Sequence, residues 1–145
     1  MIGVEFDFVV KNVLEALELY EKIFPIERVE VSNLQVGLNE VVFNLYGTRF
    51  HMLDANPEYG LVPPSANNPQ SFWFNIFVPD IKDTFHKAIE NGCTIVQDIT
   101  EVPSFGMTYA IINDPFGYVW MLHQIHRVVS HEERMKQFEE SIKKE

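Results

Sequence analysis

The sequence predicts an α+β fold made of two tandem βαβββ modules followed by a C-terminal helix. The first observation behind this prediction is a β-hairpin at residues 109–124, where two apolar runs flank the turn sequence NDPFG. The second is a stretch of the same layout at residues 42–53. The third is that residues 10–13 and 78–81 both mark a change from a strand-like run to a helix-like run. The spacing between these two segments is nearly the same as the spacing between the two hairpin-like stretches. These matching offsets indicate an internal duplication.

The first module, about residues 1–55, begins with an alternating run at residues 4–10. Glu5 and Asp7 share one face of this strand, and an acidic face needs either water or a cation. Asn12 is typical of a helix N-cap, and the amphipathic helix that follows it stops at Pro25. Short strands are then predicted at residues 27–31, 34–38, 40–45 and 49–53.

A proline-rich loop at about residues 56–69 joins the modules. Loops of this length in compact domains are usually lids, binding loops or linkers. Tyr59, Leu61 and Val62 give this loop apolar groups to bury, so we expect a partly ordered flap.

The second module, about residues 70–126, opens with FWFNIFV at residues 72–78. This run is apolar at nearly every position, which predicts a central strand covered on both faces. Asp80 caps the next helix, and a strand at 94–99 leads to the hairpin. The last helix, about residues 130–144, starts with the capping box SHEE. Its apolar stripe consists of Met135, Phe138 and Ile142.

The composition suits one substantial core and disfavours several classes of partner. Hydrophobic residues make up 46% of the 145 residues, and the net charge is −10. This charge repels nucleic acid and anionic membranes. No apolar run approaches the roughly 20 residues of a membrane helix, and no basic targeting region opens the chain, so we expect a cytoplasmic protein. We expect the single Cys93 to be a small buried residue and not a nucleophile.

The duplicated pattern resembles the vicinal-oxygen-chelate superfamily, which includes glyoxalases, extradiol dioxygenases and bleomycin- and fosfomycin-resistance proteins. The resemblance spans residues 4–126. FGMTY at residues 105–109, DPFGYVW at 114–120 and SHEE at 130–133 are similar to the PhnB-like branch. The resemblance implies that the modules form a cupped mixed sheet, that a small molecule lies in the cup, and that the protein is a homodimer with cups completed between chains.

The resemblance also implies a divalent metal ion at the floor of the cup. Its ligand positions fall on Glu5 and His51 in the first module and on Trp73 and Met121 in the second. A carboxylate and an imidazole are competent ligands, whereas Trp73 cannot ligate and Met121 suits hard divalent ions poorly. His123 shares the face of Met121 and is a weaker candidate ligand.

Without a metal, Glu5 could instead pair with Arg49, and His51 could donate a hydrogen bond inside the cup. Three functions therefore stand side by side. The first is binding of a partly aromatic small molecule, with a pocket lined by Glu5, His51, Leu53, Trp73, Phe77 and Met121. The second is a metal-dependent lyase, isomerase or dioxygenase that uses Glu5 and His51. The third is a scaffold without a ligand.

Overall fold

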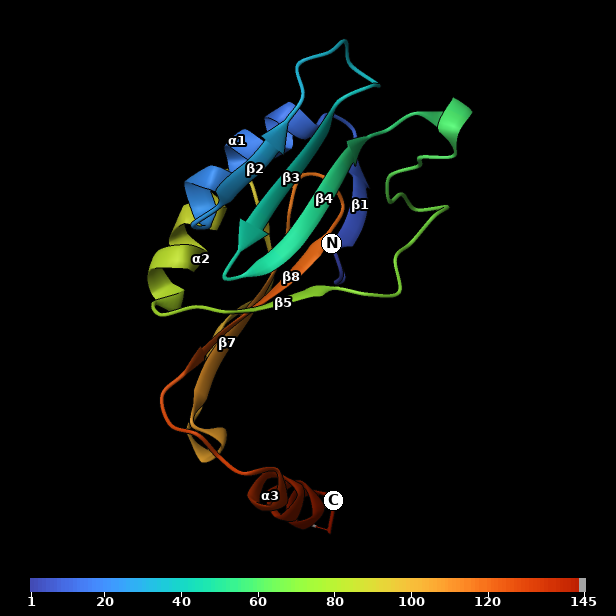
Figure 1. The fold of residues 1–145 in the computed structure, drawn as a ribbon. Coiled ribbons are helices and arrows are strands. Elements are labelled where there is room, and N and C mark those ends of the chain that lie inside the picture. Colours follow the sequence, from blue (N-terminus) through green and yellow to red (C-terminus); the bar gives the residue numbers. More distant parts are fainter. Residues whose placement is uncertain (144–145) are drawn as a thin grey trace.

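The computed structural model describes residues 1–143, which form two modules of strands and helices (Figure 1). The first module contains β1 (Phe6–Val10), α1 (Val13–Ile23), β2 (Glu27–Val31), β3 (Glu40–Leu45) and β4 (Thr48–Asp54). A loop with the 3-10 helix η1 (Pro57–Tyr59) leads onward. The second module contains β5 (Phe74–Phe77), α2 (Ile81–Glu90), β6 (Thr94–Val102), η2 (Pro103–Phe105), β7 (Met107–Asn113) and β8 (Val119–Ile125). The chain then forms α3 (His131–Lys143).

The two modules have the same sheet topology. Their strand orders are β1-β4-β3-β2 and β5-β8-β7-β6, each with one parallel pair and two antiparallel pairs. A helix connects the first strand of each module to the remaining three, which allows that strand to pair in parallel with the last one. The α+β prediction of two βαβββ units and a final helix is confirmed.

The predicted helix starts are also confirmed, because each has a side chain that satisfies free backbone N–H groups. The side chain of Asn12 accepts from Leu14 and Glu15, at 3.1 and 3.2 Å. Asp80 caps α2 in the same way. At α3 the hydroxyl of Ser130 accepts from the Glu133 amide at 3.1 Å. The predicted last residue of this helix, residue 144, lies outside the described residues.

The predicted strand at residues 34–38 is wrong. This segment is a bend and turn in which Gly37 has a φ of 102°, a conformation that favours glycine. The Asn39 side chain accepts from the Leu34 amide at 2.6 Å and donates to the Leu34 carbonyl at 2.8 Å. The buried carboxylate of Asp54 accepts from the amides of Gly37 and Asn39. Side chains therefore satisfy backbone groups that a strand partner would otherwise hold.

The prediction of a central strand at residues 72–78 is also wrong, because β5 lies at the edge of its sheet. Phe74 and Ile76 are buried, whereas Trp73 and Phe77 are 59% and 58% exposed. The two sets alternate along the strand, as strand geometry requires. The nearly continuous apolar run thus combines one core face with an exposed aromatic face.

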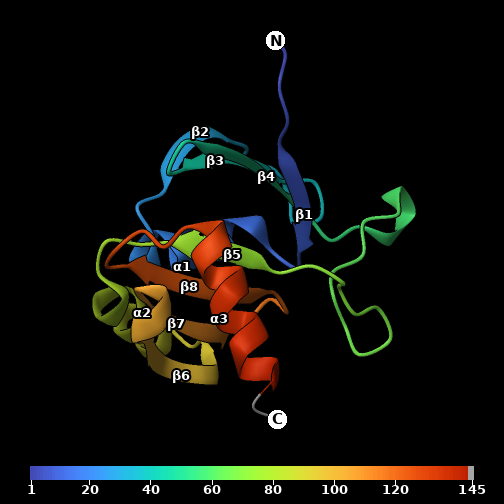
Figure 2. The same cartoon turned by 90° about the horizontal axis from the view of Figure 1, so that it is seen from below.

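The modules pack through the aromatic faces of their sheets, which lie in separate layers (Figure 2). Ring centroids of Phe8 and Phe74 are 5.2 Å apart, and those of Phe50 and Phe74 are 5.7 Å apart. Trp120 stands 4.7 Å from Phe24 at the end of α1. Since side chains alternate along strands, the opposite faces of both sheets point away from this shared core. The site described below lies on one of these outward faces.

The carboxylate of Asp114, in the turn between β7 and β8, fixes one module on the other. It accepts hydrogen bonds from the Tyr20 hydroxyl at 2.6 Å and from the Trp120 indole at 2.9 Å. The amides of Phe116 and Tyr118 donate to its second oxygen, at 2.9 and 3.0 Å. Burial raises the pKa of Asp114, and these donors counteract the rise. Because Tyr20 belongs to α1, this carboxylate joins the first module to the second.

Replacing Asp114 by Asn should therefore destabilise the whole fold. The amide group keeps one acceptor oxygen but turns an N–H₂ group toward donors, so at least one buried donor loses its partner. The expected loss in free energy of unfolding is about 1–3 kcal/mol, measured by urea denaturation. Asp98→Asn, on the exposed strand β6, is the matched control and should change little. Equal stability of the two variants would show that the carboxylate does not hold the modules together.

Candidate functional site

Three metal-competent side chains meet on the outward face of the first sheet. In the parallel pair of β1 and β4, Asp7 stands opposite His51. Glu5 precedes β1 and lies two residues before Asp7, so strand alternation directs both acidic side chains to the face of His51. Each of the three residues offers a ligand atom, and these atoms all lie within 4.8 Å of one another.

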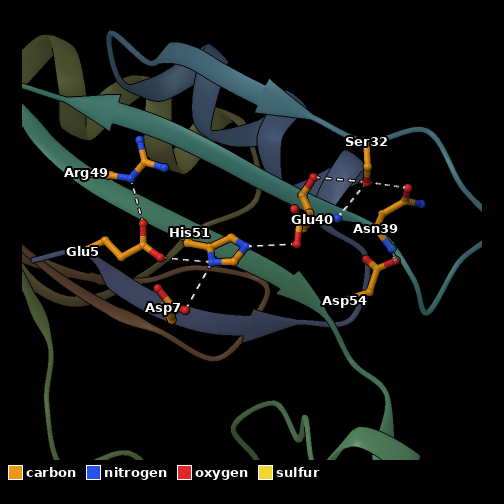
Figure 3. Close-up of polar contacts among 8 residues, drawn as sticks. All are labelled: Glu5, Asp7, Ser32, Asn39, Glu40, Arg49, His51 and Asp54. Atoms are coloured by element: carbon orange, nitrogen blue, oxygen red, sulfur yellow. Dashed lines mark hydrogen bonds and ion pairs between the residues drawn. The ribbon is translucent and has the colours of Figure 1, made fainter. Parts of the chain in front are cut away.

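The imidazole of His51 is surrounded by carboxylates (Figure 3). Its Nδ1 lies 3.3 Å from Glu5 Oε1 and 3.2 Å from Asp7 Oδ2, while its Nε2 lies 3.3 Å from Glu40 Oε2. The second oxygen of Glu5 accepts from Arg49 Nε at 2.7 Å. The ion pair between Glu5 and Arg49, one of the alternatives expected from the sequence, is therefore present.

The charges of the cluster are unevenly compensated. The hydrogen bond from Arg49 holds the pKa of Glu5 below its usual range. Partial burial, together with the neighbouring Glu5 carboxyl, raises the pKa of Asp7. Among residues 1–143, no Lys or Arg forms an ion pair with Asp7. The site therefore favours additional positive charge, from a cationic ligand or a metal ion.

The donor set fits a divalent metal ion better than the sequence suggested. Two carboxylates and one imidazole give three protein ligands, the number typical of a catalytic metal site that keeps a position open. The sequence prediction named Glu5 and His51 as candidate ligands and did not include Asp7, which completes the group of three. The signal was available, because the alternation of residues 4–10 places Asp7 on the acidic face with Glu5.

A cavity of about 650 Å³ lies beside this cluster, and Asp7 forms part of its wall. Most of its lining is aromatic, and it includes Trp73 and Phe77. The full lining consists of Phe6, Asp7, Phe8, Leu45, Tyr46, Thr48, Phe50, Phe72, Trp73, Phe74, Asn75, Ile76, Phe77 and Trp120. Asp7 thus belongs to both the cluster and the cavity.

The other predicted site residues lie elsewhere on the outward faces. Leu53 follows His51 on β4, and Met121 stands opposite Asn75 on β8; both are half-buried and neither lines this cavity. His123 is buried and does not belong to the cluster of carboxylates. Its Nδ1 lies 2.6 Å from Asn75 Oδ1, and burial lowers its pKa, so the ring is neutral at neutral pH.

Within one chain the six predicted ligand-binding residues are therefore not gathered in one place. Glu5 and His51 meet on the outward face of the first sheet, and Trp73 and Phe77 meet in the cavity. The modules pack through the inward faces of their sheets, and Asp7 is the residue of the acidic cluster that also lines the cavity with Trp73 and Phe77. Cys93 is buried away from both places, and burial raises its pKa to about 12, which excludes a thiolate nucleophile.

The family model of the Glyoxalase/Bleomycin resistance protein/Dioxygenase superfamily matches residues 4–122. The chain belongs to this superfamily. The match covers both modules and ends within β8, so it confirms the resemblance that the duplicated sequence pattern indicated. No curated protein matches the chain.

Solved structures with the same fold include other members of this superfamily. FosX, a fosfomycin resistance protein from Listeria monocytogenes complexed with Mn(II) and sulfate, has a TM-score of 0.64 and 17% identity, with 95% of this chain and 99% of that chain covered. The PhnB protein from Bacillus cereus has a TM-score of 0.65 and 19% identity, with 85% and 99% covered. TioX from Micromonospora sp. ML1 has a TM-score of 0.62 and 13% identity, with 89% and 100% covered.

This member of the Glyoxalase/Bleomycin resistance protein/Dioxygenase superfamily therefore combines a shared fold with its own set of outward-facing side chains. At these low identities the likeness to solved structures concerns the fold alone. In the described part of the chain, every helix is too short or too polar to cross a membrane.

Proposed function

We propose that this protein binds a small molecule that has an aromatic part and a cationic or hydrogen-bond-donating end. The observation that carries the proposal is the cavity of about 650 Å³, a volume within the range of small-molecule sites. Its aromatic walls would contact the flat part of the ligand, and Asp7 would contact the polar end. Glu5 and His51 stand directly behind Asp7 and complete the polar side.

The exposed rings of Trp73 and Phe77 support this proposal. Each is more than half exposed, Trp73 directly before β5 and Phe77 at its end. Burial of large apolar side chains contributes about 1.5–3 kcal/mol each, and stacking on a ligand ring adds to this. A flat ligand would therefore gain free energy by covering these two rings.

The second proposal concerns the quaternary structure, which we infer to be a homodimer. Leu53 and Met121 lie on the outward faces of different sheets, and neither lines the cavity within one chain. A second copy could place its second-sheet face, with Met121, opposite the Glu5 and His51 face of the first. Such a pairing would give a cup with one polar and one apolar half. It would also bring together all six residues that the sequence indicated.

The alternative function is a metal-dependent lyase, isomerase or dioxygenase, and one specific observation favours it. Glu5, Asp7 and His51 already lie close enough to hold one divalent ion. In this arrangement Arg49 would retain one oxygen of Glu5 and leave the other for the metal. A bound ion would supply Lewis-acid polarisation of a substrate oxygen. Glu40, on the far side of the ring, would hold the His51 orientation through Nε2.

Trp73→Ala should weaken binding of proflavine, a planar aromatic cation, by roughly 5- to 150-fold, which corresponds to about 1–3 kcal/mol of lost area and stacking. Isothermal titration calorimetry measures this change. Tyr59→Ala is the matched control, because Tyr59 is an exposed aromatic residue outside the cavity. Asp7→Asn should weaken the binding of proflavine but not the binding of the uncharged 2-naphthol. If Trp73→Ala and Tyr59→Ala have the same effect, the cavity is not the binding site.

The homodimer predicts a sedimenting mass of twice 16.9 kDa at micromolar concentration. Met121→Asp should shift the equilibrium toward the monomer, since it introduces a charge on the face that we expect to be covered. Ile95→Asp, an exposed position on β6, serves as the control. A monomeric mass for the unaltered protein would refute the dimer.

Protein purified without a chelator or an affinity tag distinguishes the metal-dependent alternative from metal-free binding. If the alternative holds, inductively coupled plasma mass spectrometry should find one divalent ion per chain. His51→Ala and Asp7→Asn should each remove it, whereas His86→Ala, on the exposed face of α2, should retain it. Metal content far below one ion per chain in the unaltered protein, after dialysis against Mn(II) or Zn(II), would exclude this alternative.

A further inference from the structure

The C-terminal helix α3 is held against the second module by few contacts. Figures 1 and 2 show it beyond the second sheet, on the side where β7 begins and β8 ends. None of the residues of α3 that the structure describes is buried. The Gln137 side chain donates to the Ser104 carbonyl at 3.0 Å and anchors the helix to η2. Met135 and Phe138 remain 43% and 55% exposed although they face the module.

The space between α3 and the outward face of the second sheet is a cavity of about 530 Å³. Its walls are largely apolar, with side chains from the sheet on one side and from the helix on the other. The main apolar groups are Phe77, Met107, Ile125, Val128, Met135 and Phe138. The α3 side chains that line this cavity are incompletely buried, so the helix does not close onto the sheet.

The charge of this cavity is opposite to that of the chain. Arg127 and Arg134 are the charged side chains among the described residues that line it, and no Asp or Glu lines it. The chain as a whole carries a net charge of −10. Arg127 is held in place, because its Nη2 donates to the carbonyls of Pro103 and Ser104, both at 3.2 Å. The charged side chains in the lining of this largely apolar space are therefore both cationic.

The remaining polar side chains of the lining carry no charge that would attract a charged ligand. His123 Nδ1 lies 2.6 Å from Asn75 Oδ1, and burial lowers the pKa of His123. The cavity beside Trp73 differs in this respect, because its charged lining residue is the acidic Asp7. The two cavities share Asn75 and Phe77 but differ in the sign of their charge.

We propose that the cavity under α3 binds an amphiphilic carboxylate. The apolar body of the ligand lies between Phe138 and the sheet, and its carboxylate reaches the guanidinium groups of Arg127 and Arg134. Guanidinium groups bind carboxylates through paired, charge-assisted hydrogen bonds. This proposal does not rest on the proposed function, because Arg127 and Arg134 line the cavity under α3 and not the cavity beside Trp73.

The experiment uses the full chain with decanoate as the probe and decyltrimethylammonium, of the same chain length, as the charge-inverted comparison. Methyl resonances of labelled methionines report the location. Met107 and Met135 line the cavity and should shift on titration with decanoate, whereas Met52 is buried in the core and should not. Calorimetry should give decanoate at least tenfold tighter binding than the ammonium compound.

Paired variants on α3 test the two parts of the site. Arg134→Gln should weaken the binding of decanoate at least threefold. Lys136→Gln, which removes the same charge outside the cavity, should not change this affinity. Phe138→Ala should weaken it at least fivefold, whereas Ile142→Ala, on the same apolar stripe but outside the cavity, should not. All four positions are exposed or nearly so, which limits effects on folding.

Several outcomes would overturn the proposal. One is equal affinity for decanoate and decyltrimethylammonium, which would show that the arginines confer no selectivity. Another is a shift of Met121 in place of Met107 and Met135. A third is that decanoate does not bind because a second copy of the chain covers the cavity. Crosslinking from position 138 to another chain would reveal this coverage. None of these outcomes alters the expectations for proflavine, so the two proposals fail separately.

Discussion

The buried carboxylate of Asp114 is the point on which the arrangement of the two modules depends. One side chain accepts from a tyrosine of the first helix, from an indole of the last strand and from two amides of its own turn. Next to it, the Tyr118 hydroxyl donates to the Val9 carbonyl and accepts from the Val9 amide on β1. Hydrogen bonds thus fix the direction in which two apolar layers pack, which hydrophobic contact alone leaves open.

That packing direction decides what each sheet presents to its surroundings. The aromatic faces turn inward, so the polar residues of β1 and β4 turn outward. Parallel pairing of β1 with β4 then brings Asp7 beside His51, although they are far apart in the sequence. The chemistry of the cluster follows from this register, because a shift by one residue would replace His51 with an apolar neighbour.

Sequence reasoning could predict the modules and the positions of Glu5 and His51, because strand alternation, helix caps and the repeated hairpin are local signals. It failed where the outcome depends on the sheet as a whole. The segment at residues 34–38 has strand-like composition, but buried Asn39 and Asp54 hold it as a turn. The apolar run at residues 72–78 could not reveal that its strand has a neighbour on one side only.

The internal duplication has a further consequence for how this protein can change. Two copies of one topology share a core through their inward residues, while their outward residues differ, with Glu5 and Asp7 in one copy and Trp73 and Phe77 in the other. Alternation along each strand separates these two sets of positions. Selection on ligand preference can therefore act on one copy without disturbing the other copy or the layer that both need in order to fold.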